Sequence, residues 1–248
     1  MRTQREILEV QRLASAGVNN CEIARRTGIP RSTIRTWLAG RTPQLDPASR
    51  ARTSPPDLAA LPTLEYAYLF GLYLGDGCLT ACPRDVYKLR IALDSKYPRI
   101  IAACVASIRS VMPNNRTNVW KHPRHNVVEV NCHSKWWPLL FPQHGPGRKH
   151  ERAILIDPWQ LRLLDAEQPL QQLLRGLIHS DGCRVLNKVN GGVYPRYHFS
   201  NRSAEIRAIF GGACDELGIH WTQNNLWNLS VARRPDVARL DAFIGPKA

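Results

Sequence analysis

A ten-residue pattern occurs twice in this chain, and the duplication constrains the fold more than any other feature. Residues 69–78 read LFGLYLGDGC and residues 174–183 read LRGLIHSDGC, so the copies agree at Leu, Gly, Leu, Asp, Gly and Cys. Both are apolar stretches of helical character that end in an aspartate followed by a glycine, 105 positions apart. The pair predicts a duplicated fold with two matched carboxylates.

The two aspartates, Asp76 and Asp181, are predicted in the last turn of their helices. We interpret Gly77 and Gly182 as left-handed C-caps, which places the aspartates in that turn. A helix C-terminus carries partial negative charge, so carboxylates are unfavourable there. A solvated surface tolerates such an acid, but its occurrence in both copies is better explained by a divalent cation that reverses the local electrostatics.

Small residues repeat along both apolar stretches. Gly71 and Gly75 in the first copy, and Gly176 and Ser180 in the second, are four residues apart, so each pair lies on one helix face. Small residues at this spacing let two helix backbones approach closely. Because side-by-side packing brings both aspartates to one end, we predict a metal-linked carboxylate pair there.

These residues resemble the motifs of the LAGLIDADG (dodecapeptide, or DOD-type) homing endonuclease family, matched here by LFGLYLGDG at 69–77 and LRGLIHSDG at 174–182. The resemblance implies an α+β fold of two αββαββα repeats, with the motif helices at their interface and saddle-shaped antiparallel sheets along the major groove of DNA. It also implies that Asp76 and Asp181 bind the divalent metals, Mg²⁺ or Mn²⁺, that cut DNA.

The ends of the two halves carry a second matched pair, since each has a Phe, then a Gly-Pro segment, then a lysine, Lys149 or Lys247. The resemblance implies that these lysines are catalytic, reaching the active site to stabilise charge or orient water. An ordinary solvated lysine and a frayed C-terminus remain the alternatives. Asp94 and Asn201, on the second strand of each half, match the family position that contacts an ordered water or a base.

The implied reaction is metal-assisted hydrolysis of a phosphodiester. One ion polarises the attacking water and another stabilises the departing oxygen. Two side chains cannot fill six oxygen positions around magnesium, so phosphate oxygens and waters complete the coordination. The sixth motif position, often acidic in the family, is Leu74 in one copy and His179 in the other. His179 is a possible catalytic base, although a histidine packed at the helix interface is the more common outcome.

The net charge of +14 points to a polyanionic partner. Basic residues outnumber acidic ones by 10 to 4 in residues 1–52 and by 24 to 16 in the remainder, so no single basic tail explains the charge. No apolar run is long enough to span a membrane, and residues 1–17 lack a signal-peptide core. The seven scattered cysteines favour a reducing cytoplasm. We therefore expect a cytoplasmic, nucleoid-associated protein that binds double-stranded DNA and no membrane.

Residues 1–40 are predicted to form a helix-turn-helix DNA-binding domain. The stretch EIARRTGIPRSTIRTWLAG resembles a helix-turn-helix, in which the second helix of the pair enters the major groove. A helix-turn-helix used only for packing or partner contact remains the alternative. Three helices are predicted, over 4–16, 21–27 and 31–39, with Asn19 or Asn20 as the cap of the second. The predicted core is Ile23, Ala24, Ile29, Ile34, Trp37 and Leu38, and the residues predicted to face DNA are Arg31, Ser32, Thr33, Arg35 and Thr36.

Five prolines across residues 41–62 favour an extended linker. The second domain is then 63–248, with repeats at about 63–150 and 168–248. After the first motif we predict strands over 78–82 and 87–93, a helix over 98–112, strands over 118–121 and 127–132, and a helix over 135–141. After the second we predict strands over 183–186 and 197–200, a helix over 204–217, strands over 221–223 and 226–232, and a helix over 235–243.

Basic residues on these strands and hairpins are the predicted DNA surface. Only about half can face one side of a sheet, because side chains alternate along a strand. Their phosphate contacts would position the protein, whereas sequence reading needs contacts to base edges. The residues are Arg84, Lys88, Arg90, Lys121, Arg124, Arg184, Lys188, Arg196, Arg233 and Arg234.

Our leading hypothesis is a free-standing, monomeric DNA endonuclease, a pseudo-dimer by internal repeat, with an added helix-turn-helix. We do not expect an intein, because Met1 leads directly into the helix-turn-helix and the chain lacks a terminal His-Asn. The rival is a transcription regulator whose endonuclease fold only binds DNA, and an RNA-binding splicing helper is a third alternative. Retention of both aspartates favours the enzyme, and the helix-turn-helix favours the regulator.

Overall fold

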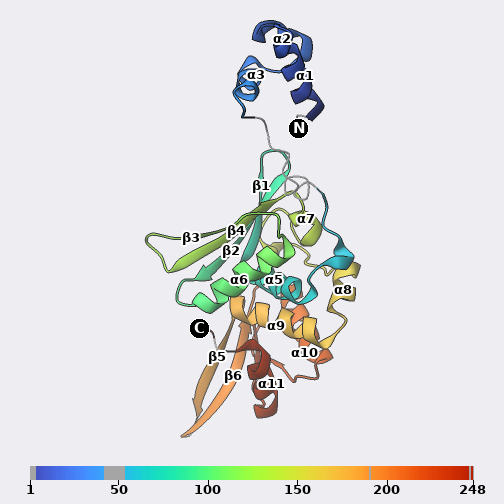
Figure 1. Ribbon diagram of the computed structural model, residues 1–248. Coiled ribbons are helices and arrows are strands. Elements are labelled where there is room, and N and C mark those ends of the chain that lie inside the picture. The colour runs from blue at the N-terminus through green and yellow to red at the C-terminus, as the bar shows by residue number, and fades with distance from the viewer. Residues whose placement is uncertain (1–3, 42–53, 190, 246, 248) are drawn as a thin grey trace. The chain divides into compact units, whose positions relative to one another are not determined.

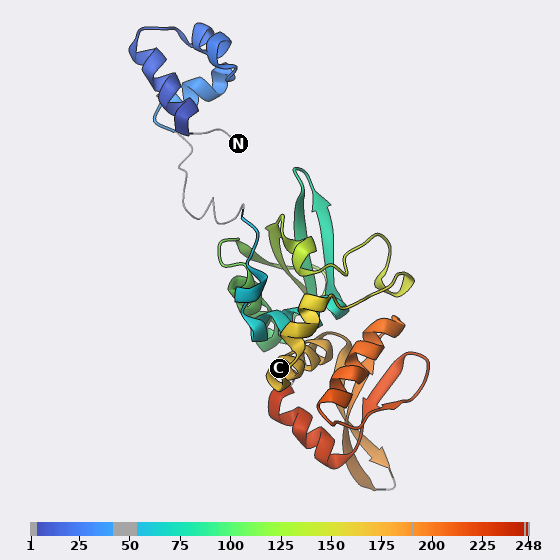
Figure 2. The same ribbon diagram turned by 90° about the vertical axis from the view of Figure 1, so that its right-hand side faces the viewer.

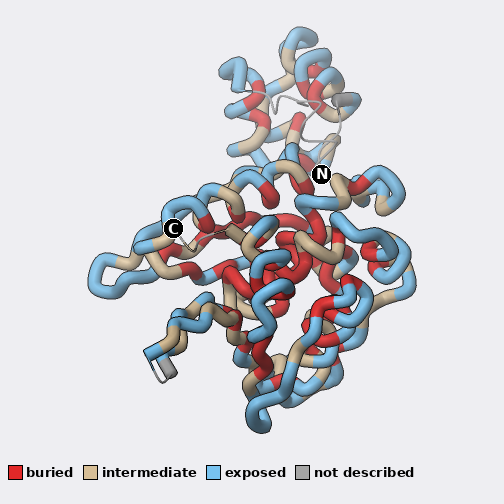
Figure 3. The backbone as a smooth tube through the Cα atoms, turned by 90° about the horizontal axis from the view of Figure 1, so that it is seen from below, coloured by how far each residue is buried: buried red, intermediate tan, exposed pale blue. Residues whose placement is uncertain are grey.

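The chain divides into two compact units, residues 1–54 and 55–248, in a computed structural model that describes residues 4–41, 54–189, 191–245 and 247 (Figure 1). The predicted linker prolines Pro43 and Pro47 lie outside the described residues. Buried residues, red in Figure 3, gather in the interior of each unit. No helix within the described parts of the chain has the length and apolar character that crossing a membrane requires.

Within residues 4–41, the described part of the first unit contains three helices, α1 (Gln4–Ser15), α2 (Asn20–Thr27) and α3 (Arg31–Leu38). The side chain of Asn19 accepts hydrogen bonds from the backbone N–H groups of Cys21 and Glu22, and so caps α2. Gly28, with φ of 66°, ends α2 in the left-handed conformation that glycine adopts without strain. A short turn then leads into α3.

A small apolar core holds the three helices together. Its buried members are Ile7, Val10, Leu13, Ile23, Ile29, Ile34 and Trp37. The prediction that Leu38 belongs to this core is wrong, because its side chain is 38% exposed. Ile34 and Trp37 are three positions apart and share the inward face of α3, whereas the next residue turns by about 100° toward solvent.

The second unit consists of two repeats, each with a four-stranded antiparallel sheet, and the predicted αββαββα order is confirmed. The first repeat contains α5 (Thr63–Asp76), β1 (Gly77–Cys82), β2 (Val86–Asp94), α6 (Pro98–Val111), β3 (Thr117–Lys121), β4 (Val127–Ser134) and α7 (Trp137–Leu140). A connection that includes α8 (Pro158–Leu164) leads to the second repeat: α9 (Glu167–Asp181), β5 (Gly182–Val189), β6 (Gly192–Ser200), α10 (Ala204–Glu216), β7 (Thr222–Gln223), β8 (Asn228–Val231) and α11 (Arg234–Ile244).

The two sheets have the same strand order, β1-β2-β4-β3 and β5-β6-β8-β7. Each has one face covered by helices, on which residues such as Leu89 and Ile91 of β2 are buried. On the second sheet, Phe199 of β6 stacks on Phe210 of α10 with ring centroids 4.6 Å apart. We call the opposite face of each sheet its outer face.

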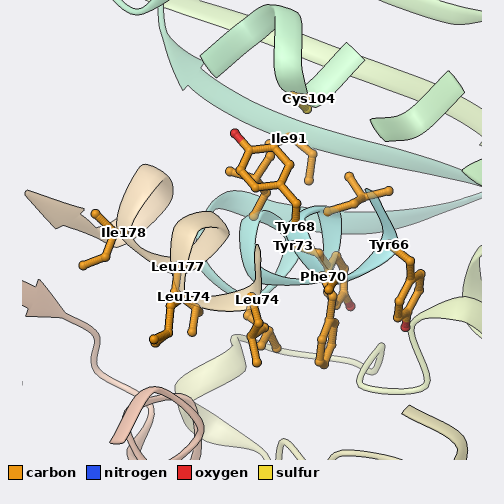
Figure 4. Packing of buried hydrophobic residues seen from close by; sticks show 14 of the residues in the cluster. Tyr66, Tyr68, Phe70, Tyr73, Leu74, Ile91, Cys104, Leu174, Leu177 and Ile178 are labelled. Carbon is orange, nitrogen blue, oxygen red and sulfur yellow. The ribbon is translucent and has the colours of Figure 1, made fainter. Parts of the chain in front are cut away.

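The motif helices α5 and α9 pack side by side at the centre of the second unit (Figure 1). Tyr66 to Leu74 of α5 are all buried, so this helix is apolar around its whole circumference. Figure 4 shows Leu74 beside Leu174 of the second motif helix, while Tyr68 points toward Cys104 of α6. The duplicated sequence thus forms the core that joins the two repeats.

Candidate active site

The four residues predicted at the helix interface lie where α5 and α9 approach each other most closely. A Cβ added to Gly71 would lie 2.5 Å from the carbonyl oxygen of Leu173, and one added to Gly176 would overlap the carbonyl oxygen of Tyr68. A Cβ on Gly75 would overlap the side chain of Ser180. The absence of a side chain at Gly71, Gly75 and Gly176 is therefore what allows the two helices to approach so closely.

Asp76 and Asp181 are the last residues of α5 and α9. The prediction that Gly77 and Gly182 are left-handed caps is wrong, because their φ angles are −91° and −112° and each begins a strand. Glycine is required for space instead: a Cβ on Gly77 would lie 2.5 Å from the Cα of Tyr73. Each chain segment passes directly from helix to strand at its aspartate.

The two aspartates lie close enough to repel each other. Burial and the charge of Asp181 raise the pKa of Asp76 to about 7. Burial also raises the pKa of Asp181, but Asn201 opposes this shift by donating a 2.6 Å hydrogen bond from Nδ2 to Asp181 Oδ2. The pair is thus electrostatically unequal, with Asp76 the member that holds a proton more readily near neutral pH.

Lys149 and Lys247 lie at the ends of the motif helices. The Nζ of Lys149 donates to the carbonyl oxygens of Tyr73, Leu74 and Gly75, the last two at 3.0 Å. The Nζ of Lys247 donates to Gly182 O at 2.6 Å and to Ser180 O at 3.4 Å. Each ammonium group therefore offsets the partial negative charge of a helix C-terminus.

The same two lysines stabilise the ionised aspartates, since each lowers the pKa of both Asp76 and Asp181. Burial lowers the pKa of Lys149 to about 8, against the opposing attraction of both aspartates. The structure thus brings together all four residues predicted to be catalytic. The hydrogen bonds that the two lysines donate to the carbonyl oxygens at the helix ends were not predicted from the sequence. The matched Gly-Pro-lysine segments at the ends of the two halves indicated only which lysines lie at the site.

His179 is packed in the helix interface and is not available as a base. Its Nδ1 lies 2.9 Å from Tyr68 Oη, and its Nε2 lies 3.2 Å from the carbonyl oxygen of Ile244. Because a carbonyl only accepts, Nε2 carries the proton and Nδ1 accepts from the tyrosine hydroxyl. Burial lowers the pKa of His179 to about 4, which keeps the ring neutral.

Asp94 is the last residue of β2, whereas Asn201 directly follows the end of β6. Asp94 pairs with Lys96 at 2.9 Å and borders a cavity of about 250 Å³ that Asp76 and Lys247 also line. Gly77, the first residue of β1, pairs with Ile91, and Gly182, the first residue of β5, pairs with Phe199. Asn201 is two residues after Phe199, so its equivalent in the first repeat is Leu93, two residues after Ile91, and not Asp94. The predicted correspondence is therefore offset by one residue.

The donor set fits a hard divalent cation. Two neighbouring carboxylates, one with its pKa raised by the other's charge, leave negative charge that such a cation would offset. In the described part of the chain, no group of three or more His, Cys, Asp or Glu side chains is placed to hold a metal ion. The remaining coordination positions would fall to oxygens from water or from a bound phosphate.

The residues predicted to contact DNA divide between the two faces of the sheets. Lys88 and Arg90 alternate with buried residues of β2 and lie on the outer face of the first sheet, where each forms an ion pair with Glu129, at 2.5 and 3.7 Å. Arg196 lies on the outer face of the second sheet. Arg184 instead shares the helix-covered face and binds Asp241 of α11 through two hydrogen bonds of 2.7 and 2.9 Å.

The other predicted DNA contacts are spread over the edges of both units. Lys188 is four residues after Arg184 on β5. Because side chains alternate along a strand, it lies on the same, helix-covered face of the sheet as Arg184. The exposed residues Arg84, Lys121 and Arg124 lie in or beside the β1–β2 and β3–β4 turns, and Arg233 and Arg234 lie at the start of α11. On α3, Thr33 is half-buried, and the exposed residues are Arg31, Ser32, Arg35 and Thr36.

No family model and no curated protein matches this chain. The solved structure of the homing endonuclease I-DmoI in complex with DNA and Mn matches with a TM-score of 0.51 at 14% identity, over 74% of this chain and 97% of that chain. The complex of I-DmoI with DNA and Ca gives a TM-score of 0.50 at 15% identity, over 73% and 89%. The N-terminal LAGLIDADG domain of DUF199/WhiA gives 0.47 at 12% identity, over 80% and 89%. The resemblance read from the motifs is thus confirmed at the level of the fold: this chain contains the two-repeat LAGLIDADG fold of homing endonucleases.

Proposed function

We propose that this protein is a site-specific, divalent-metal-dependent DNA endonuclease. The observation that carries the proposal is the carboxylate pair Asp76 and Asp181, held side by side at the ends of the duplicated helices despite mutual repulsion. The I-DmoI structures, which share the fold, contain DNA with Mn or Ca. We also propose that the protein acts as a monomer, since the internal repeat supplies both halves of the site. Its proposed location is the cytoplasm, in association with the nucleoid.

Asp76 and Asp181 would hold Mg²⁺ or Mn²⁺, which when bound polarises the attacking water and stabilises the departing oxygen. Lys149 and Lys247 supply positive charge beside the carboxylates and fix both helix ends through their carbonyl contacts. Asn201 fixes the orientation of the Asp181 carboxylate by its hydrogen bond. The scissile phosphate would therefore meet an Asp181 carboxylate whose orientation is set before DNA binds.

Each unit has its own proposed DNA surface: the outer faces of the two sheets in the second unit, and the exposed side of α3 in the first. Lys88, Arg90 and Arg196 are the central basic residues of the sheet faces, while Arg184 and Lys188 are left out because they face the helices. Arg31 and Arg35 on α3 would contact DNA through the first unit. Phosphate contacts from this set would position the protein on the duplex.

DNA affinity is expected to fall steeply with salt. Each phosphate contact adds a slope of about −0.9 to a plot of log K against log salt concentration, because counterions are released. Replacing Arg90 with alanine should reduce that slope by about 1, whereas replacing the Asp241-bound Arg184 should change it by less. Fluorescence anisotropy across a salt series measures both slopes. A salt slope near zero for the wild type would contradict the proposed surface.

A catalytically silent DNA-binding regulator is the second candidate, and the basic, exposed α3 favours it. One experiment separates the two: purified protein is incubated with sheared genomic DNA and Mg²⁺, and both new ends and bound fragments are sequenced. Recurrent ends at one sequence, absent in EDTA and with Asp76→Asn, would support the endonuclease. Enriched bound fragments without new ends would support the regulator.

Cleavage is expected to increase as the pH rises through about 7, because Asp76 must be ionised to hold a cation. Below that pH, the cleavage rate at a fixed, subsaturating Mg²⁺ concentration should fall by up to about tenfold per unit. Additional Mg²⁺ should recover part of the loss, because the cation competes with the proton. Single-turnover rates from pH 5.5 to 9 test this, and a rate independent of pH would contradict it.

A further inference from the structure

An open groove of about 680 Å³ lies on the helix side of the second unit. It is bounded by the segment 154–156, by α8, by the first half of α9 and by α10. In Figure 1 α8 and α10 lie on the right, whereas the β3–β4 and β5–β6 hairpins extend to the left. Figure 2 views the unit from the α8 side. We call this feature the α8–α10 groove.

Two large apolar side chains are presented to solvent at the groove. Leu155 is 73% exposed and Leu161 is 53% exposed. The backbone beside them is fixed, because Nε2 of the buried Gln143 donates a 2.7 Å hydrogen bond to the carbonyl oxygen of Leu155. Exposed leucines on a fixed, concave surface are characteristic of a binding site for another apolar surface.

The α10 wall of the groove has the geometry of a helix-docking face. The groove-lining residues of α10 repeat at intervals of three and four, so they form one stripe along the helix, about 16 Å long for eleven residue steps. Its middle is small: a Cβ added to Gly212 would have no atom within 4 Å. The stripe consists of Glu205, Ala208, Ile209, Gly212, Ala213 and Glu216.

Acidic side chains mark both ends of this stripe. Glu205 and Glu216 stand at its ends and Asp165 lies at the end of α8. None of these three takes part in an ion pair among the described residues. Arg162 of α8 is the basic residue that also lines the groove. A rim with three acidic residues and one basic residue, in a chain of net charge +14, matches a partner with basic residues at its ends.

We propose that the α8–α10 groove docks an amphipathic helix from a partner protein, with apolar side chains at positions i, i+3, i+4 and i+7 and lysine or arginine at both ends. The length of the stripe corresponds to about three helical turns. Because α10 covers the face of the second sheet opposite its outer face, an occupied groove leaves the outer faces free. The docking site thus does not depend on the proposed nuclease.

The test uses two fluorescein-labelled synthetic helices of about 15 residues with the same leucine stripe, one with lysines at both ends and one with glutamates. We expect the lysine peptide to bind the full chain with micromolar affinity and the glutamate peptide at least about tenfold more weakly. The double variant Leu155→Asp, Leu161→Asp should weaken the lysine peptide at least about tenfold. Leu226→Asp, at a residue 68% exposed outside the groove, should leave its binding unchanged.

Unfolding midpoints verify that the variants fold. Failure of the lysine peptide to bind, or equal binding to the double variant, would overturn the proposal. Analytical ultracentrifugation tests whether the groove is instead occupied by a second copy of this chain. A dimer of the full chain that dissociates in the Leu155→Asp, Leu161→Asp variant would assign the groove to that second copy and overturn the proposal.

Discussion

Asp76→Asn is expected to abolish DNA cleavage and at the same time to make the protein more stable at pH 8. The cleavage loss should be at least about 100-fold, since even groups that only support a metal ligand contribute 10–100-fold. The stability gain follows from linkage. Because the folded pKa of Asp76, about 7, exceeds its ordinary value of 3.8, ionising this group costs more in the folded state.

The sign of the effect fixes its pH window. Between pH 3.8 and about 7 the folded protein binds more protons than the unfolded chain, so the free energy of unfolding falls across that window and stays low above it. Asparagine carries no charge, so the variant should gain roughly 2–4 kcal/mol over wild type at pH 8 and little at pH 4. Urea unfolding at the two pH values measures the difference.

Asp94→Asn is the matched control for this prediction. Hydrogen bonds from Lys96 lower the pKa of Asp94, so its removal should not stabilise the protein at pH 8. DNA affinity of Asp76→Asn should remain close to that of the wild type, because the basic surfaces are unchanged. An Asp76→Asn protein that still cuts would remove the assignment of Asp76 as a metal ligand, and one that shows no stability gain over wild type at pH 8 would contradict the raised pKa of Asp76.

Gly176→Ala is expected to be among the most damaging single-methyl changes in this chain. The new Cβ would overlap the carbonyl oxygen of Tyr68, which is helix backbone and cannot rotate away. The motif helices must then separate, and we expect a loss of about 3 kcal/mol or more in the free energy of unfolding. Separation would also move Asp181 relative to Asp76.

Gly212→Ala provides the matched control, because its Cβ would meet no atom within 4 Å on the exposed side of α10. Alanine at an unstrained helix position should stabilise by about 0.5–1 kcal/mol. Both variants add one methyl group to a helical glycine, so intrinsic propensity favours both and only packing separates them. Equal unfolding midpoints for Gly176→Ala and Gly212→Ala would contradict the close packing of the motif helices.

The duplicated motif predicted the two helices, their contact and the aspartates at their ends. It could do so because both copies carry small residues four positions apart and an aspartate at the same place. The glycines after the aspartates were assigned the wrong conformation. In the structure Gly77 and Gly182 are extended and are required by space, which depends on how a strand leaves the helix rather than on local propensity. The sequence pattern could not separate these two reasons for glycine.

Strand lengths were less predictable than strand order. The β5–β6 hairpin runs from Gly182 to Ser200, whereas the predicted strands ended at residue 186 and began again at residue 197. Its outer part carries polar residues and Pro195, so the alternation of apolar residues that signals a strand is absent there. Pairing with a neighbouring strand determines its structure instead.

Tertiary structure decided which basic residues belong to the proposed DNA surface, because it sets the face of the sheet on which each side chain lies. Arg184 was predicted to contact DNA, but Asp241, 57 positions later, binds its guanidinium. Lys149 reaches helix carbonyls 74–76 positions earlier. Such contacts are set by tertiary structure, and a single sequence contains no local signal for them.

The most direct test of the central claim, that Asp76 and Asp181 form one divalent-cation site, is the urea unfolding midpoint at pH 8 with and without Mn²⁺. A cation that binds only the folded protein stabilises it, by about 1.4 kcal/mol at ten times its dissociation constant. We predict that Mn²⁺ raises the midpoint of the wild type and leaves those of Asp76→Asn and Asp181→Asn unchanged. An equal shift in all three proteins, or no shift in the wild type, would contradict the site.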